Sequence, residues 1–232
     1  MRLLPLMLLA LAFWLSKPLE AQMRAGSSGL LNIPVGEIHP DKTFSAGLNY
    51  LPVGQVSKSF GGNTANYFFN LSFLPFTELT YRLTLFAVHR KGNFTQQDRS
   101  FNVKFRLLKE QKILPSLLAG MEDIYSSGSG EGNQYFASSY VVSTKTLSTR
   151  AHIFRLTAGY GYNYKSRASL DGVFGGLSYS PKRFSNVTLL AEYDTRHFNF
   201  AGTVLLWKHL FIYGGYYGTD EPAAGLAYRI HL

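Results

Sequence analysis

The last ten residues, Ala223–Leu232, read A-A-G-L-A-Y-R-I-H-L. Counted back from the carboxylate, every second side chain is apolar: Leu232, Ile230, Tyr228, Leu226 and Ala224. The alternate positions hold small or polar residues, so the segment predicts a strand with one face suited to lipid and the other suited to water or a polar interior. A strand that continues to the last residue favours pairing with the first strand, because closure removes the exposed sheet edges. The terminus therefore predicts a closed antiparallel β-barrel of the outer-membrane type.

The first residues, 1–22, resemble a secretory signal peptide. They combine a basic start at Arg2, an apolar run over Leu3–Leu15 and a small residue near the exit, Ala21. The apolar run is too short for a helix that crosses a bilayer. The sequence contains no cysteine, which argues against a lipid-anchored lipoprotein and excludes disulfides and thiolate metal sites. We expect residues 1–22 to be removed and the mature protein to reside in the cell outer membrane.

About twelve alternating segments follow the leader, separated by turn-forming residues. Their ranges are Thr43–Leu51, Asn66–Phe73, Glu78–His89, Ser100–Leu108, Ser116–Ile124, Gln134–Thr144, His152–Tyr164, Gly172–Ser180, Asn186–Asp194, Phe198–Trp207, Leu210–Tyr217 and Ala223–Leu232. Most have about the length that a tilted strand needs to cross a bilayer. We therefore expect a signal peptide (1–22), an N-terminal segment that lies in the periplasm or plugs the barrel (23–42), and a transmembrane β-barrel (43–232). A soluble β-sandwich is the alternative fold, which the leader and the terminal strand disfavour.

The alternation is clearest in the third, fourth, seventh and ninth segments. In Glu78–His89, for example, Leu79 and Tyr81 alternate with Thr80 and Arg82. A charged side chain on the lipid face at the bilayer centre costs about 2–4 kcal/mol, so the charged positions are predicted to face the lumen. The alternation is interrupted around Asp123, Tyr125 and Tyr140, and their faces are left open.

The candidate site residues are the polar and charged side chains that this parity or their motifs direct toward the lumen. They are Arg82, Lys104, Arg106, Glu122, Asp123, Arg155, Glu192, Asp194 and Asn199. Such groups can bind an anionic or hydroxyl-rich chain through charge-assisted hydrogen bonds, or they can pair with one another and fill the barrel. About twelve strands leave a narrow or plugged lumen, so both interpretations stay open.

Composition excludes several other classes of function. The net charge is +9, but lysine and arginine occur singly rather than in a cluster, so nucleic-acid binding is not expected. The aromatic content of 15% fits the girdles of a membrane barrel. The six histidines show no ligand spacing, and no catalytic, metal or cofactor site is predicted. An enzyme acting on lipid or lipopolysaccharide is an alternative that would need a serine or carboxylate beside a histidine at the outer lipid boundary.

Four stretches resemble the YjbH family of outer-membrane proteins, which are associated with exopolysaccharide biosynthesis. The first is Gly26–Val35 followed by Asp41–Phe44, and the second is Phe73–Arg82. The third comprises Leu118–Ile124 and Tyr140–Lys145, and the fourth is Leu190–Asp194 with Asn199. The chain is short for the family and resembles a single-barrel form.

The resemblance implies a process more than a mechanism. It leads us to expect a non-enzymatic outer-membrane barrel that assists export or assembly of surface exopolysaccharide. The expected partners are outer-membrane lipid, polysaccharide and periplasmic export components. A simple diffusion pore is a further alternative, which predicts conductance through an open lumen.

Overall fold

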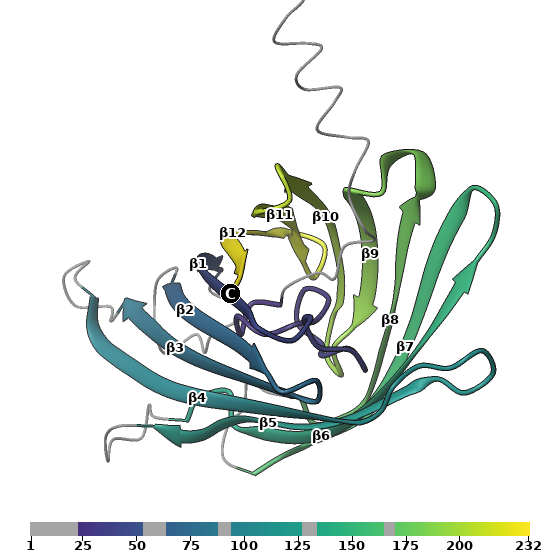
Figure 1. The fold of residues 1–232 in the computed structure, drawn as a ribbon. Helices are drawn as coiled ribbons and strands as arrows, with labels where there is room; N and C mark the ends of the chain where they lie inside the picture. The colour runs from purple at the N-terminus through teal and green to yellow at the C-terminus, as the bar shows by residue number, and fades with distance from the viewer. Residues whose placement is uncertain (1–22, 53–63, 88–93, 127–133, 165–169) are drawn as a thin grey trace, which may run out of the picture.

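A computed structural model describes residues 23–52, 64–87, 94–126, 134–164 and 170–232 as one closed antiparallel barrel of twelve strands (Figure 1). The strands are β1 (Thr43–Leu51), β2 (Thr64–Phe73), β3 (Thr77–Ala87), β4 (Phe94–Leu108), β5 (Ser116–Ser126), β6 (Ser138–Ser148), β7 (His152–Asn163), β8 (Gly172–Pro181), β9 (Val187–Tyr193), β10 (Phe198–Leu206), β11 (Leu210–Tyr217) and β12 (Glu221–His231). The leader predicted at residues 1–22 lies outside the described residues. Within the described residues, no helix is long and apolar enough to cross a membrane.

The last strand closes the barrel against the first. Thr43 lies opposite His231, Tyr50 lies opposite Ala224, and the Leu232 amide donates to the Lys42 carbonyl at 2.7 Å. The predicted alternation of β12 is confirmed, because Leu226 and Tyr228 are exposed on the outside whereas Ala227 is buried inside. Closure leaves neither terminal strand with an unpaired edge.

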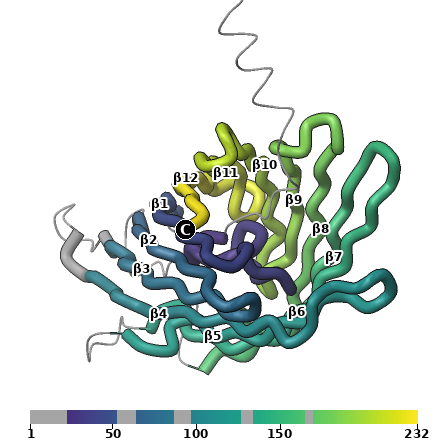
Figure 2. The backbone as a smooth tube through the Cα atoms, in the orientation of Figure 1, coloured from purple at the N-terminus to yellow at the C-terminus, as the bar shows by residue number. Residues whose placement is uncertain are grey.

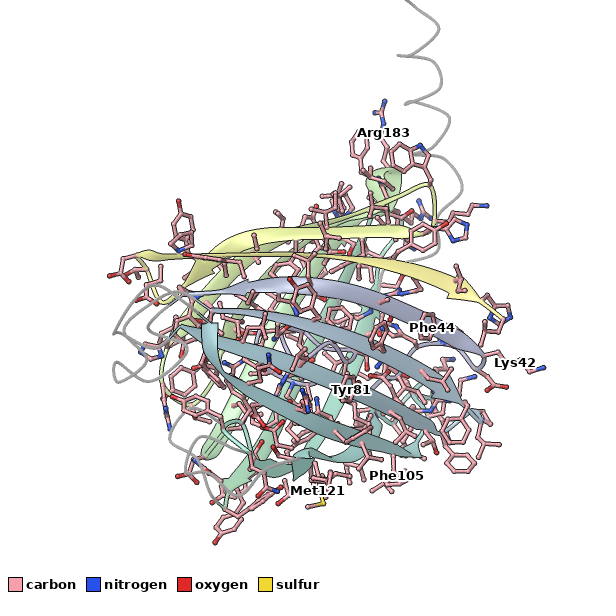
Figure 3. All side chains as sticks on the ribbon, turned by 90° about the vertical axis from the view of Figure 1, so that its left-hand side faces the viewer. Lys42, Phe44, Tyr81, Phe105, Met121 and Arg183 are labelled. Atoms are coloured by element: carbon pink, nitrogen blue, oxygen red, sulfur yellow. The ribbon has the colours of Figure 1, made fainter. Side chains whose placement is uncertain are left out.

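Side-chain parity is confirmed in the strands where the sequence shows it best. In β3, Leu79 is 39% exposed on the outer face, whereas Arg82 is 1% exposed in the interior. The outer face also carries a row of aromatic rings that steps across β1 to β5, with neighbouring centroids 5.2 to 6.4 Å apart. The rings are Phe44, Phe69, Tyr81, Phe101 and Tyr125. Figure 3 shows Phe44, Tyr81, Phe105 and Met121 together on this apolar outer surface.

The largest differences from the predicted strand boundaries are in β4 and β6. β4 begins at Phe94 instead of Ser100, because Asp98 in its polar first half faces inward and accepts from the Ser126 hydroxyl at 2.6 Å. β6 covers Ser138–Ser148 instead of Gln134–Thr144. Gln134 has a φ of +58° and its carbonyl accepts from the Ala137 amide, so the apolar residues before Ser138 form a turn that buries Phe136.

β5 contains an irregularity that settles the faces left open by the sequence. Phe101 lies opposite Tyr125 and Val103 lies opposite Met121, so β5 has two extra residues at this point. Asp123 has a φ of +52° there, and both Glu122 and Asp123 are buried on the interior side. Tyr140 is also interior, whereas Tyr125 is 61% exposed on the outside.

The barrel is filled from within by residues 23–42, called the plug below. Figure 2 shows this purple segment passing inside the ring of strands before it joins β1. Most residues from Met23 to Ile38 are buried. Of the two positions that the sequence left open for this segment, in the periplasm or inside the barrel, the structure has the second. The apolar side chains of the plug form one hydrophobic cluster with inward-facing wall residues such as Phe68, Phe174 and Phe211. The plug residues in this cluster are Leu30, Leu31, Ile33, Val35 and Ile38.

Candidate functional site

The plug is a compact segment in which four backbone hydrogen bonds join residues between Met23 and Ile33. The Leu30 amide donates to the Ile33 carbonyl at 2.9 Å, and an isolated bridge joins Gly29 to Pro34. Gly26 has a φ of +82°, and a Cβ at that position would lie 2.3 Å from a ring carbon of Phe68. The close approach and the backbone conformation both require glycine. Buried backbone groups must find partners, and the plug finds many of them on the wall.

Glu192 of β9 holds the tip of the plug. Its carboxylate is 2% exposed and accepts the backbone amides of Leu31 at 2.9 Å and Asn32 at 2.7 Å. The Ile33 amide makes a longer contact of 3.4 Å, and the Asn199 side chain donates at 2.9 Å. Successive backbone amides that converge on one anion form a concave binding site called a nest. Here the plug supplies the amides, and the wall supplies the anion, which is the Glu192 carboxylate.

Asp194 and Asn199 extend the same network. Asp194 Oδ2 accepts from the side-chain amides of Asn32 at 2.8 Å and Asn199 at 3.0 Å. Asp194 Oδ1 accepts the backbone amides of Arg196 and His197, which fixes the connection between β9 and β10. The stretch Leu190–Asp194, together with Asn199, therefore joins the plug to one end of the barrel wall.

A second carboxylate on the opposite part of the wall holds two further points of the plug. Glu78 of β3 is 1% exposed and accepts the backbone amides of Ser28 at 2.7 Å and His39 at 3.2 Å. Beside it, the Lys104 ammonium donates to the Ser28 carbonyl. Sequence reasoning missed Glu78, although it shares the inward parity of Thr80 and Arg82 in its strand.

Side-chain amides and hydroxyls of the wall complete the contacts. Asn49 and Asn66 donate to the Arg24 carbonyl at 2.9 and 2.8 Å, and the Gly36 amide donates to Thr144 Oγ1 at 2.8 Å. None of these three wall residues was predicted as a site residue. In the sequence, only their inward-facing positions in the strands point to these residues. Most interior polar residues of a barrel share that property, so it does not single them out.

Arg82 and Asp123 form a buried ion pair next to the plug, with side chains 1% and 0% exposed. The Asp123 carboxylate also accepts the Phe136 amide at 2.8 Å. The guanidinium groups of Arg82 and Arg24 lie 4.4 and 4.6 Å from the centroid of the Phe136 ring. One wall arginine and one plug arginine therefore share an aromatic partner from the connection before β6.

Three predicted site residues, Arg106, Arg155 and Glu122, lie away from the contacts described so far. Arg106 is half-buried, 3.3 Å from the plug carboxylate Glu37, and also donates to the Pro75 carbonyl. Arg155 is half-buried on the inward side of β7. Glu122 is buried, and its Oε1 atom has no hydrogen-bond partner among the described residues. Most of the predicted residues thus contact the plug or one another.

The outer wall has a groove of about 440 Å³ across β4 to β7. Small residues form part of its lining, notably Ala119, Gly120 and Ser139, between larger side chains such as Phe105 and Tyr160. None of the predicted site residues lines it. Within the described residues, no group of three or more histidine or acidic side chains is arranged to hold a metal ion.

A comparison with protein families matches residues 21–171 to the YjbH model, described as "Exopolysaccharide biosynthesis protein YbjH". The chain belongs to the YjbH family. Three of the stretches that resemble the family meet in the structure, because Gly26–Val35 lies between Glu78 and Glu192. These three stretches therefore lie where the plug meets the wall.

A curated relative in Escherichia coli (strain K12) is named "Uncharacterized lipoprotein YjbH". It is 25% identical over 253 residues, which cover 90% of this chain and 33% of that protein. The present YjbH-family chain thus spans about a third of the length of the relative it matches. The relative's name describes a lipoprotein, whereas the present sequence contains no cysteine.

Proposed function

We propose that this YjbH-family chain is a non-enzymatic outer-membrane barrel that assists export or assembly of surface exopolysaccharide with its lumen closed by the plug. The observation that carries the proposal is the pair of buried wall carboxylates, Glu78 and Glu192, which bind the plug backbone at four amides within 3.2 Å. Charge-assisted hydrogen bonds of this kind are stronger than neutral ones. Polysaccharide and export components then meet the barrel at its ends.

The outward surface supports a place in a membrane. Large apolar side chains are exposed on all parts of the barrel, for example Phe69 at 52%, Leu156 at 49% and Phe200 at 50%. Soluble monomers seldom expose contiguous apolar surface on this scale, because water disfavours it. An outward apolar band with polar groups inside is typical of outer-membrane barrels.

The polysaccharide that the cells secrete tests the proposal. In cells that lack this protein, we expect less exopolysaccharide at the surface, with the monosaccharide composition and linkages of the remaining polymer unchanged. Complementation with the wild-type chain should restore the amount. Methylation analysis separates the candidates, because an altered linkage or substituent pattern would indicate an enzyme that modifies the polymer. An unchanged amount would contradict a role in export or assembly.

A further inference from the structure

One end of the barrel is formed by the described connections from β2 to β3, β4 to β5, β6 to β7, β8 to β9 and β10 to β11, together with the C-terminus. We call it the turn end. Three of its connections place an exposed cation next to an exposed large apolar side chain, and these six residues are called the collar. They are Lys112 with Ile113, Arg183 with Phe184, and Lys208 with Trp207. The apolar members are 84%, 47% and 64% exposed.

The connection between β10 and β11 has an unfavourable backbone for its residues. Trp207 and Lys208 have φ values of +49° and +66°, and the His209 amide donates to the Leu206 carbonyl at 3.0 Å. Three residues separate the strands, because Leu206 pairs with Leu210. Positive φ at both central residues of the turn from Leu206 to His209 is the signature of a type I′ turn, for which Asn-Gly is favoured. A tryptophan in this conformation is strained, so local turn preference does not explain why these two side chains occur here.

The other two connections present similar pairs. The Arg183 guanidinium lies 5.8 Å from the centroid of the Phe184 ring, and Figure 3 shows Arg183 projecting from the end of its hairpin. In the connection between β4 and β5, Lys112 and Ile113 lie near Glu110. Partial burial acts to raise the pKa of Glu110, but hydrogen bonds from Thr146 and Lys145 outweigh it and hold the pKa below its ordinary value.

The acidic side chains described at the turn end make contacts that do not include the collar cations. Glu110 pairs with Lys145 at 3.3 Å, and Glu37 pairs with Arg106 at 3.3 Å. Asp41 accepts the Lys42 amide at 3.0 Å, and Glu78 is buried inside the barrel. The exposed surface of this end is therefore basic, since Lys109, Arg150 and Lys182 add to the collar cations.

We propose that the collar binds anionic phospholipid headgroups, with Ile113, Phe184 and Trp207 inserted at the level where headgroups meet acyl chains. The proposal rests on the outer-membrane location proposed above. Aromatic side chains favour this interfacial level, and lysine or arginine near an anionic leaflet attracts its headgroups. The combination fixes the depth of the barrel and places the turn end in a phospholipid leaflet.

Trp207 provides the probe, because the only other tryptophan is Trp14. The full-length Trp14→Phe chain is folded into phosphatidylcholine vesicles containing phosphatidylglycerol, and either lipid is brominated in its acyl chains to quench Trp207 fluorescence. We expect phosphatidylglycerol to be favoured over phosphatidylcholine about fivefold around Trp207 at low salt, and this preference to vanish at high salt. Lys208→Gln should bring the ratio close to unity, whereas Arg196→Gln at the other end should leave it unchanged.

The two proposals fail in different ways. Equal quenching by both lipids, with a barrel that resists detergent, would overturn the collar and leave the membrane location standing. Absence of quenching by either lipid in a folded protein would overturn the membrane location itself. A type I′-optimised variant, Trp207→Asn with Lys208→Gly, should raise the unfolding midpoint in micelles. If it lowers that midpoint, the collar residues are structural and the proposal is wrong.

Discussion

Replacing Glu192 with glutamine is expected to release the tip of the plug and open the barrel to ions. The substitution keeps the shape of the side chain but removes the charge that binds the Leu31 and Asn32 amides at 2.9 and 2.7 Å. Hydrogen bonds to a buried charged group contribute about 1.5–3 kcal/mol, so exchange of these two amides with deuterium should accelerate at least about tenfold. In planar bilayers the wild-type protein should be silent, and Glu192→Gln should show conductance steps.

The combination with Glu78→Gln removes the second carboxylate that holds the plug. Because Glu78 binds the amides of Ser28 and His39, the double variant should spend more time open than either single variant. Asp220→Asn, at an exposed position of the same charge type, is the matched control and should remain silent. Large steps from the wild-type protein would favour the simple diffusion pore instead.

Arg82→Met is expected to produce the largest loss of stability among single substitutions in the wall. It leaves the Asp123 carboxylate, which is 0% exposed, without its cation partner. Removing one partner of a buried ion pair costs about 3–5 kcal/mol, mostly through the charge that stays buried. The loss should appear as a lower denaturant midpoint for unfolding in detergent, and the Arg82 contact with Phe136 should be lost with it.

A double-mutant cycle separates the ion pair from packing. Asp123→Asn removes the stranded charge, so Arg82→Met combined with Asp123→Asn should be more stable than Arg82→Met alone by about 1–3 kcal/mol. Arg196→Met, an exposed arginine in the connection between β9 and β10, should change stability little. Additive losses in the cycle would mean that the pair contributes no coupling energy.

The barrel could be predicted from the sequence because one physical rule applies to every strand. Charges such as Arg82, Lys104 and Glu192 alternate with apolar side chains, and only one register turns them to the inner face. The same rule directed nearly all predicted site residues into the lumen. It failed where the two-residue period is broken, as at Asp123 in the irregular part of β5 and at Gln134 before β6.

The contacts of the plug could not be predicted in this way. Residues 23–42 have no period, and their partners lie far along the chain, with Asn32 and Glu192 separated by 160 positions. Alternation shows that Glu192 faces inward, but the nature of its partner depends on how the barrel closes. A buried carboxylate facing backbone amides looks identical in sequence to one facing an open channel.

The plug inside the lumen is tested most directly by an engineered disulfide, since the sequence contains no native cysteine. A Cβ at Gly36 would lie 3.3 Å from the Ser116 Cβ and 2.8 Å from the Thr144 amide nitrogen, so the plug backbone must shift slightly to reach the Cβ separation of about 3.5–4.5 Å that a disulfide requires. Gly36→Cys with Ser116→Cys should lose both free thiols on folding under mild oxidation. Gly36→Cys with Leu117→Cys, where the neighbouring side chain of β5 has the outward parity, should keep them. Equal oxidation of both variants, or oxidation of the Leu117 pair alone, would contradict a plugged barrel.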